Sequence, residues 1–354
     1  MALSKFTLGL ALVVALGSGC GDEAPSTGSD INPAHGDGDG DDEGDGDGDG
    51  DGDGDGDGDG DVGDGDGDGD VGDGDGDVGD GDGDVGDGDG DAGTEKPMGT
   101  GECCDDGDCL CHGPSPKALT SDNGPFKTAE LKLPLGTVTY PTDAEPPFAS
   151  VALCGGFTNT GPEMKAWAPF YASYGIVTII VTTDGIDDPG TRATKLLAAL
   201  DQLLAENGKS GSPLQNKLDV ERVGTSGYSM GGGGTTIAST KRPTLKSSVG
   251  LAAWNPATSG ITVPTLLLCG NSDTTAACNM SQGAYGNIKD PTPKMIVKID
   301  GTTHFNWFGP TDAGGGVSGK YALAFQKVYL EGDTRWASVL KSTLAKSQMT
   351  TNIK

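Results

Sequence analysis

One short stretch of the chain decides how it folds: Gly227-Tyr228-Ser229-Met230-Gly231. It follows residues 220–225, which have the pattern of a buried strand, and it opens residues 231–236, a run of small side chains typical of a closely packed helix. A serine in a sharp turn between a strand and a helix needs neighbours without side chains, because both elements pass close to it. The context therefore predicts a nucleophile elbow, with Ser229 as the nucleophile.

A base for this serine is the next requirement. A serine hydroxyl is a weak nucleophile near neutral pH and needs an imidazole that takes its proton. Of the 3 histidines in the chain, His35 borders a repeat near the N-terminus and His112 lies in a cysteine cluster. His304 follows a predicted strand over 295–299, whose end would carry it to the active edge of a parallel sheet. We expect His304 to be the general base.

The third member of such a site is a carboxylate between the serine and the histidine. The acids in that interval are Asp273, Asp290 and Asp300. Asp273 comes just after a predicted strand over 265–268, whereas Asp290 lies in a proline-rich turn and Asp300 lies only four residues before the histidine. We therefore prefer Asp273. The resulting order of serine, aspartate and histidine along the chain is that of α/β-hydrolases.

Around this site, strand patterns and helix patterns alternate from about residue 124 to residue 346. Strands are predicted at 136–140, 149–154, 176–182, 220–225, 248–253, 265–268 and 295–299. Helices are predicted at 162–173, 191–207, 231–239 and 320–330. Continuous apolar strands separated by helices predict an α/β protein of the α/β-hydrolase fold, with a mostly parallel central sheet and helices on both faces.

The formal net charge of −30 describes only the N-terminal part of the chain. Residues 1–96 hold 31 of the 53 acidic residues and 2 of the 23 basic ones, which leaves 22 acidic and 21 basic residues after them. The Asp-Gly repeat at about 35–91 has too few apolar residues to fold. We therefore expect a disordered spacer. It should associate with calcium only loosely, because it lacks the bidentate glutamate of a specific calcium loop. No nucleic-acid partner is expected.

The N-terminus has the features of an export signal. One positive charge and an apolar run over 6–16, too short to span a bilayer, precede Gly17-Ser18-Gly19-Cys20. Small residues directly before a cysteine resemble the lipobox of bacterial lipoproteins. The resemblance implies that Cys20 carries a lipid, which anchors the protein to a membrane of the bacterial cell envelope. Secretion without an anchor is the alternative, and both place the domain where disulfides persist.

Seven cysteines follow Cys20. Four lie in the cluster 103–111 beside His112, where we expect local disulfides, with a zinc site as the alternative. Cys269 and Cys278 flank the preferred aspartate and could clip its loop. Cys154 lies in an apolar run and is predicted to be a buried free thiol. The predicted segments are a signal peptide over 1–19, an Asp/Gly-rich linker over 20–96, a Cys-rich segment over 97–117 and a catalytic domain over 118–354.

Several stretches together resemble the bacterial cutinases and polyester (PET) hydrolases, which are related to dienelactone hydrolases. They span about 124–340 and are Asn123-Gly124-Pro125-Phe126, Gly136-Thr137-Val138-Thr139-Tyr140-Pro141, Asp188-Pro189-Gly190-Thr191-Arg192, Ser229-Met230-Gly231-Gly232-Gly233-Gly234, Leu251-Ala252-Ala253-Trp254 and Asp333-Thr334-Arg335. The resemblance implies a serine ester hydrolase that acts on aliphatic or aromatic esters, polyesters among them, and needs no metal or organic cofactor.

The same resemblance implies an oxyanion hole made by the backbone N–H groups of Phe157 and Met230. Phe157, Met230 and Trp254 would also line the acyl-binding cleft, with ordinary core packing as the alternative. The C-terminal disulfide of the family has no counterpart, because no cysteine follows Cys278. Two other classes stay open: an esterase or dienelactone-hydrolase-like enzyme for small soluble substrates, and a noncatalytic acidic surface lipoprotein.

Overall fold

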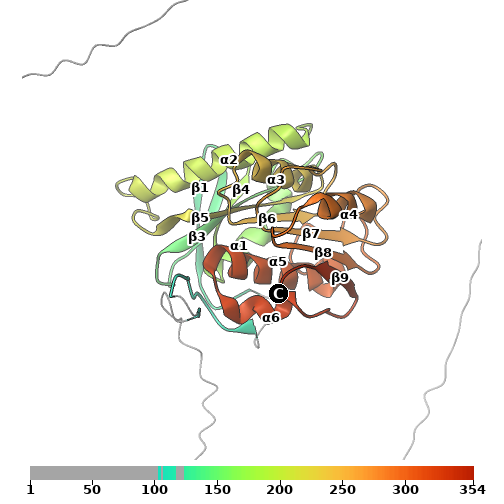
Figure 1. Cartoon of the computed structure of the whole chain (residues 1–354). Helices are drawn as coiled ribbons and strands as arrows, with labels where there is room; N and C mark the ends of the chain where they lie inside the picture. Colours follow the sequence, from blue (N-terminus) through green and yellow to red (C-terminus); the bar gives the residue numbers. More distant parts are fainter. Residues whose placement is uncertain (1–102, 105–106, 117–122) are drawn as a thin grey trace, which may run out of the picture. The chain divides into compact units, whose positions relative to one another are not determined.

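Parallel strands form the centre of the fold (Figure 1). The structure, a computed structural model, describes residues 103–104, 107–116 and 123–354, so the predicted signal peptide, Cys20, His35 and the Asp-Gly linker lie outside it. The strands are β1 (Thr128–Leu133), β2 (Gly136–Pro141), β3 (Phe148–Cys154), β4 (Val177–Val181), β5 (Leu218–Tyr228), β6 (Ser247–Leu251), β7 (Thr265–Gly270), β8 (Lys294–Ile299) and β9 (Ser347–Thr351). They make one nine-stranded sheet in the order β1-β2-β4-β3-β5-β6-β7-β8-β9.

The strands from β3 to β8 pair in parallel. At one side of the sheet β2 pairs antiparallel with β4 and β1 with β2, and at the other side β9 pairs antiparallel with β8. The helices are η2 (Pro162–Met164), α1 (Trp167–Ala172), α2 (Pro189–Ala205), η3 (Glu206–Gly208), α3 (Met230–Lys241), α4 (Cys278–Asn287), η4 (Ala313–Gly315), α5 (Val317–Gln326), the π-helix η5 (Lys327–Glu331), η6 (Thr334–Trp336) and α6 (Ala337–Leu340).

Helices cover both faces of the sheet. Figure 1 shows α2, α3 and α4 on one face and α1, α5 and α6 on the other. Apolar side chains of both layers pack on the sheet and form the buried core. The predicted α/β-hydrolase fold with a mostly parallel central sheet is confirmed. Among the helices that the structure describes, none has both the length and the apolar character needed to span a bilayer.

The elements that the sequence pattern does not predict lie mainly at the margins. Residues of β1 and β9 alternate between exposed and half-buried positions, because an edge strand faces solvent and lacks a buried apolar run. The helix α4 buries only Ser281 and Ala284 and so has no apolar stripe. The strand predicted over 248–253 is wrong at its end: β6 stops at Leu251, because Ala252 has a positive φ of 44°.

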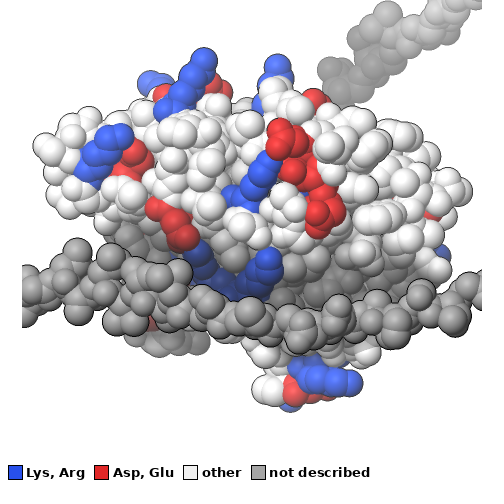
Figure 2. All heavy atoms as spheres, turned by 90° about the horizontal axis from the view of Figure 1, so that it is seen from above, with Lys and Arg blue, Asp and Glu red and all other residues white. Residues whose placement is uncertain are grey.

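Charged side chains of both signs are mixed on the face of the domain seen in Figure 2. Basic and acidic side chains lie close together in several places there, and wide areas carry neither. Ion pairs of the described residues join Lys195 to Asp184 and Asp187, and Arg242 to Asp201. This mixture agrees with the near-equal numbers of acidic and basic residues after residue 96.

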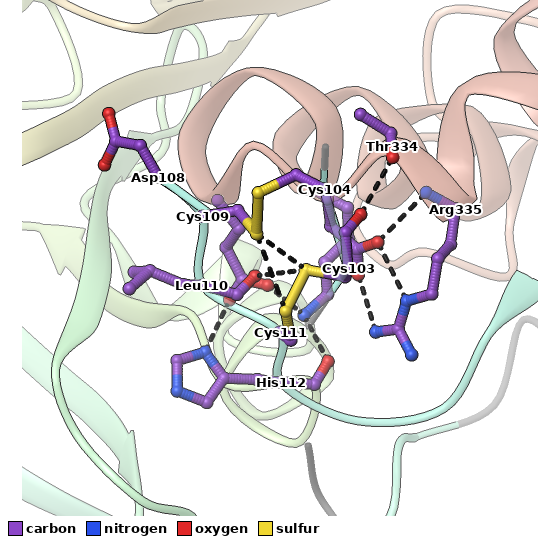
Figure 3. Close-up of a disulfide and its surroundings, with 12 residues drawn as sticks. Cys103, Cys104, Asp108, Cys109, Leu110, Cys111, His112, Thr334 and Arg335 are labelled. Carbon is purple, nitrogen blue, oxygen red and sulfur yellow. Dashed lines mark hydrogen bonds and ion pairs between the residues drawn. A yellow bond between two sulfur atoms is a disulfide. The ribbon is translucent and has the colours of Figure 1, made fainter. Parts of the chain in front are cut away.

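The Cys-rich segment packs at the amino-terminal edge of the sheet. Disulfides join Cys103 to Cys111 and Cys104 to Cys109 (Figure 3), so the predicted local disulfides are confirmed. The sulfur atoms of Cys103, Cys109 and Cys111 lie within 4.8 Å of one another, the spacing of a metal site. Because all four sulfur atoms are in disulfides, none is a thiolate that could bind zinc.

His112, the remaining candidate zinc ligand, is part of a buried ionic cluster. Its Nδ1 lies 2.9 Å from Glu331 Oε1 and its Nε2 lies 2.8 Å from the carbonyl oxygen of Glu145. Lys327 Nζ lies 2.6 Å from Glu331 Oε2 and 2.7 Å from the carbonyl oxygen of His112. Burial would raise the pKa of Glu331, but the charges of Lys327 and His112 outweigh it and hold that pKa below its usual range. The cluster ties the Cys-rich segment to η5.

We expect Glu331→Gln to lower the free energy of unfolding by about 3–5 kcal/mol, because the buried Lys327 ammonium loses its countercharge. Urea denaturation at pH 7 measures this change. The control is Lys209→Ala, which breaks an ion pair with Glu206 at a position where the Lys209 side chain is 62% exposed. That variant should change the free energy of unfolding by less than about 1 kcal/mol.

The difference in the free energy of unfolding between wild type and Glu331→Gln should also depend on pH. The pKa of Glu331 is lower in the folded than in the unfolded protein, so its contribution is complete above the usual glutamate pKa and is lost as the pH falls through the folded value. The stability difference between wild type and Glu331→Gln should therefore shrink in acid. A difference that is absent at pH 7, or that grows in acid, would contradict this account of the cluster.

Candidate active site

Ser229 lies in a strained turn. The strand β5 ends at Tyr228, α3 begins at Met230, and Ser229 between them has φ 55° and ψ −118°. A backbone of this kind costs a residue with a side chain about 1–3 kcal/mol, which the surrounding packing must offset. A Cβ on Gly227 would collide with the carbonyl oxygen of Gly231. The glycines on both sides of the serine are thus a requirement of the turn.

His304 reaches the turn from the loop that follows β8. Its Nε2 lies 3.0 Å from Ser229 Oγ, and its Nδ1 lies 2.8 Å from Asp273 Oδ2. All three side chains are buried. Because a carboxylate only accepts hydrogen bonds, the imidazole N–H is on Nδ1, and the lone pair of Nε2 faces the serine hydroxyl. This is the geometry that proton transfer from the serine requires.

Asp273 is held by the loop that follows β7. Its Oδ1 accepts hydrogen bonds from the backbone N–H groups of Thr275 at 2.9 Å and Ala276 at 2.8 Å. The loop is closed by a disulfide between Cys269 in β7 and Cys278 at the start of α4. One carboxylate oxygen is thus fixed by the backbone, and the other is left for the imidazole.

The two other aspartates considered as the acid lie elsewhere. Asp290 Oδ1 accepts a hydrogen bond from Asn352 Nδ2 at 2.7 Å, and Asp300 Oδ1 accepts one from Asn271 Nδ2 at 3.0 Å. Both of these bonds are formed at exposed positions. The structure therefore brings Asp273 to the imidazole and leaves both alternatives at the surface.

Phe157 and Met230, expected as the oxyanion-hole residues, both lie beside the nucleophile. Met230 is the first residue of α3, where backbone N–H groups have no partner within the helix. Phe157 follows Gly156, whose own N–H donates to Asn159 Oδ1 at 2.9 Å. Gly156 passes so close that a Cβ on it would lie 2.5 Å from Ser229 Cβ. The turn that carries Phe157 is therefore packed directly against the nucleophile.

A cavity of about 300 Å³ opens at the nucleophile. Its lining residues are Phe157, Thr158, Tyr228, Ser229, Met230, Trp254, Thr275, His304 and Phe305. The three predicted cleft residues, Phe157, Met230 and Trp254, are all among them. Two larger surface cavities, of about 620 and 610 Å³, are lined by none of the three triad residues. The smaller cavity is thus the one that serves the triad.

Besides Thr158, which follows Phe157, three lining residues have no role predicted from the sequence: Tyr228, Thr275 and Phe305. The Tyr228 hydroxyl donates to the carbonyl oxygen of His304 at 2.7 Å, and the two rings lie 5.2 Å apart. Burial raises the pKa of Tyr228, and the charge of Asp273 raises it further, so the hydroxyl keeps its proton. Each of the three lies within two residues of a triad member, and this adjacency was the available signal.

Exposed apolar side chains lie in the cavity and close to it in the fold. Phe157 and Phe305, which line it, are 56% and 70% exposed. Ile186 is 84% exposed and follows Gly185, whose carbonyl oxygen accepts the N–H of Thr158 at 2.7 Å. These three side chains form an apolar rim, defined here as Phe157, Ile186 and Phe305. Large apolar side chains gathered in this way mark a binding surface.

Cys154 ends β3 directly before the glycines of the Phe157 turn. It is buried and is not in a disulfide, as predicted. Burial raises the pKa of the Cys154 thiol to about 12, although the nearby charge of Arg192 acts in the opposite direction. The thiol therefore stays protonated and cannot compete with Ser229 as a nucleophile.

A serine, an imidazole and a carboxylate joined by hydrogen bonds at the carboxyl edge of a mostly parallel sheet define the α/β-hydrolase class. Their order along the chain is the one found in that class. Comparison with known families then narrows the assignment. The chain belongs to the PET hydrolase-like family, whose model matches residues 106–353.

Several cutinases and a terephthalate ester hydrolase are similar in sequence to this chain. Cutinase est2 of Thermobifida alba is 33% identical over 242 residues, which cover 64% of this chain and 78% of the relative. Cutinase 1 of Thermobifida cellulosilytica is 31% identical over 242 residues, 64% of this chain and 89% of the relative. Bis(hydroxyethyl) terephthalate hydrolase of Streptomyces coelicolor is 29% identical over 243 residues, 64% and 76% of the two chains. The expected resemblance to cutinases and PET hydrolases is confirmed.

Proposed function

We propose that this chain, a carboxylic ester hydrolase by its family, cleaves esters by acyl transfer through Ser229. The observation that carries the proposal is the continuous series of hydrogen bonds from Asp273 through His304 to Ser229, at 2.8 and 3.0 Å. A serine is activated when a neighbouring base accepts its proton, and the base needs a third group to orient it. The buried triad supports each of these roles.

In the first step, His304 Nε2 takes the hydroxyl proton while Ser229 Oγ attacks the ester carbonyl carbon. The carbonyl oxygen becomes an oxyanion, to which the N–H groups of Phe157 and Met230 donate. His304 then gives the proton to the alcohol oxygen as the C–O bond breaks. In the second step, water that loses a proton to His304 releases the acid and restores the serine. Asp273 orients the imidazole and stabilises its protonated form throughout.

We further propose neutral, hydrophobic esters as substrates, polyesters among them. The relatives named as cutinases and as a terephthalate ester hydrolase support this class. A cavity of about 300 Å³ suits a single acyl unit, and the apolar rim offers a surface for the rest of a polymer. An esterase or dienelactone-hydrolase-like enzyme for small soluble esters is the second candidate. The position of Phe305 at the cavity mouth favours this candidate, because a bulky side chain there would restrict the entry of a polymer chain.

Ser229→Ala should abolish hydrolysis of p-nitrophenyl butyrate, with a loss of roughly 10⁴-fold or more, because the nucleophile is gone. Release of p-nitrophenol measures the rate, and circular dichroism checks that the variant is folded. The control is Ser210→Ala at an exposed surface position, which should keep full activity. Retained activity in Ser229→Ala would refute the mechanism, and an inactive wild type would favour the noncatalytic surface lipoprotein.

Ile186→Ser should slow the release of soluble products from a polyester film about fivefold, because an apolar contact with the polymer is lost. Hydrolysis of p-nitrophenyl butyrate should not change, since this short ester stays within the cavity, which Ile186 does not line. The matched control is Val220→Ser, which removes another exposed apolar side chain, near the end of β5 that lies away from Ser229. A wild type that cleaves the soluble ester but no film would favour the small-substrate enzyme.

We also propose that the protein is exported and anchored to the bacterial cell envelope by a lipid on Cys20. The export signal over 1–19 and the small residues before Cys20 support this location. Three disulfides among the described residues fit it too, because disulfides persist outside the cytoplasm. The linker over 20–96 would join the anchor to the domain and bind calcium only loosely. Secretion without an anchor is the alternative.

Cells that express the full chain should incorporate labelled palmitate into the protein, and Cys20→Ala should abolish this label. The physical reason is that the acyl chains are attached to this one residue. The control is Cys154→Ala, which removes a buried cysteine of the domain and should leave the label unchanged. A wild-type protein that carries no label and is recovered free in the medium would support simple secretion.

A further inference from the structure

Arg192 is a fully buried cation on α2 that takes part in none of the ion pairs among the described residues. A guanidinium has five N–H donors in a planar fork. Five oxygen acceptors surround this one. They are the Asp187 carbonyl at 2.9 Å from Nε, the Gly155 carbonyl and Thr183 Oγ1 each at 2.9 Å from Nη1, and the Asp184 and Gly185 carbonyls at 3.2 and 3.3 Å from Nη2.

Two of these acceptors hold the turn that carries Phe157. Gly155 precedes the turn, and its carbonyl oxygen accepts directly from the Arg192 guanidinium. On the other side of Phe157, the N–H of Thr158 donates to the carbonyl oxygen of Gly185 at 2.7 Å. That same oxygen accepts from Arg192 Nη2. The backbone is therefore tied to Arg192 both before and after Phe157.

A second route runs through Thr183. Its hydroxyl accepts from Arg192 Nη1 and donates to the carbonyl oxygen of Asn159 at 2.8 Å. The side-chain oxygen of Asn159 in turn accepts the N–H of Gly156, the residue directly before Phe157. The loop after β4 and the turn after β3 are thus joined into one hydrogen-bonded unit around a single guanidinium.

The cost of this arrangement points to a role beyond stability. A buried charge without a carboxylate partner is expensive, and an apolar side chain of similar volume often stabilises a protein as well or better. A planar fork with five donors, however, can fix several carbonyl groups in set directions, which an apolar side chain cannot do. The oxyanion hole needs such precision, because a misplaced donor forfeits most of its stabilisation.

We propose that Arg192 is a positioning residue for the oxyanion hole: it fixes the peptide groups on both sides of Phe157, so that the Phe157 N–H is directed at the developing oxyanion of Ser229. Its positive charge, buried behind the same turn, is opposite in sign to that oxyanion. The inference rests on the proposed acyl-transfer function. It adds to that function a residue that touches neither the substrate nor the triad.

The test compares wild type, Arg192→Met and Arg192→Lys as full-length proteins with p-nitrophenyl butyrate. Reactive serines are counted with a fluorophosphonate, so that misfolded molecules do not enter kcat. Affinity for butylboronic acid reports on the hole itself, because Ser229 Oγ bonds to boron and leaves a tetrahedral, negatively charged adduct. The matched control is Arg242→Met, which removes an arginine that pairs with Asp201 at 2.8 Å on the surface.

Arg192→Met should lower kcat per reactive serine on the order of 100-fold and weaken boronate affinity in parallel, with KM within about twofold of wild type. Arg192→Lys keeps the charge but loses the fork, so a loss of about tenfold is expected. Arg242→Met should keep kcat, KM and boronate affinity. A purely structural role would lower the melting temperature and the number of reactive serines while kcat per serine stayed the same.

The inference would be overturned if Arg192→Met had a lower melting temperature and fewer reactive serines, but kept the wild-type kcat per reactive serine and the wild-type boronate affinity. If Arg192→Met does not fold, Thr183→Val takes its place, because it cuts the link to Asn159 and leaves the guanidinium present. A several-fold parallel loss of kcat and boronate affinity supports the proposal, and unchanged values refute it. A wild type that hydrolyses no ester would refute the proposed function instead, so the two failures are distinguishable.

Discussion

The left-handed backbone of Ser229 is the constraint on which the carboxyl edge of the sheet depends. A serine with φ 55° is held there only because β5, α3 and the turn after β3 meet without side chains between them, which Gly227 and Gly231 allow. The same packing brings Phe157 against the nucleophile and leaves Ser229 Oγ 3.0 Å from His304. Strain at one residue is thus offset by the packing of the elements that meet at this edge.

The two edges of the sheet serve different purposes. The carboxyl edge carries the triad, the cavity and the apolar rim. At the amino edge lies the Cys-rich segment, which two disulfides close internally (Figure 3) and which His112 joins to the buried Lys327 and Glu331. Cys103, the first residue that the structure describes, thus lies at the end of the sheet opposite to Ser229.

Much of the site could be predicted because its requirements are local or allow few choices. The glycines identify Ser229, and elimination among three histidines leaves His304. Other roles arise only from contacts between distant residues: Arg192 and Gly155 are 37 positions apart, and Lys327 and His112 are 215 apart, so no periodicity could show either pair. The strands β1 and β9 were missed for another reason, since solvent-facing edge strands have no buried apolar pattern.

In the mechanism that we propose, the fold activates one serine, Ser229. The most direct measurement treats the native full-length protein with a fluorophosphonate and locates the adduct by peptide mass mapping, because only a serine whose proton a positioned base accepts during attack reacts quickly with this reagent. We expect rapid, stoichiometric modification of Ser229 in the folded protein and none after unfolding in urea. Modification of another residue, or equal reaction of folded and unfolded protein, would contradict it.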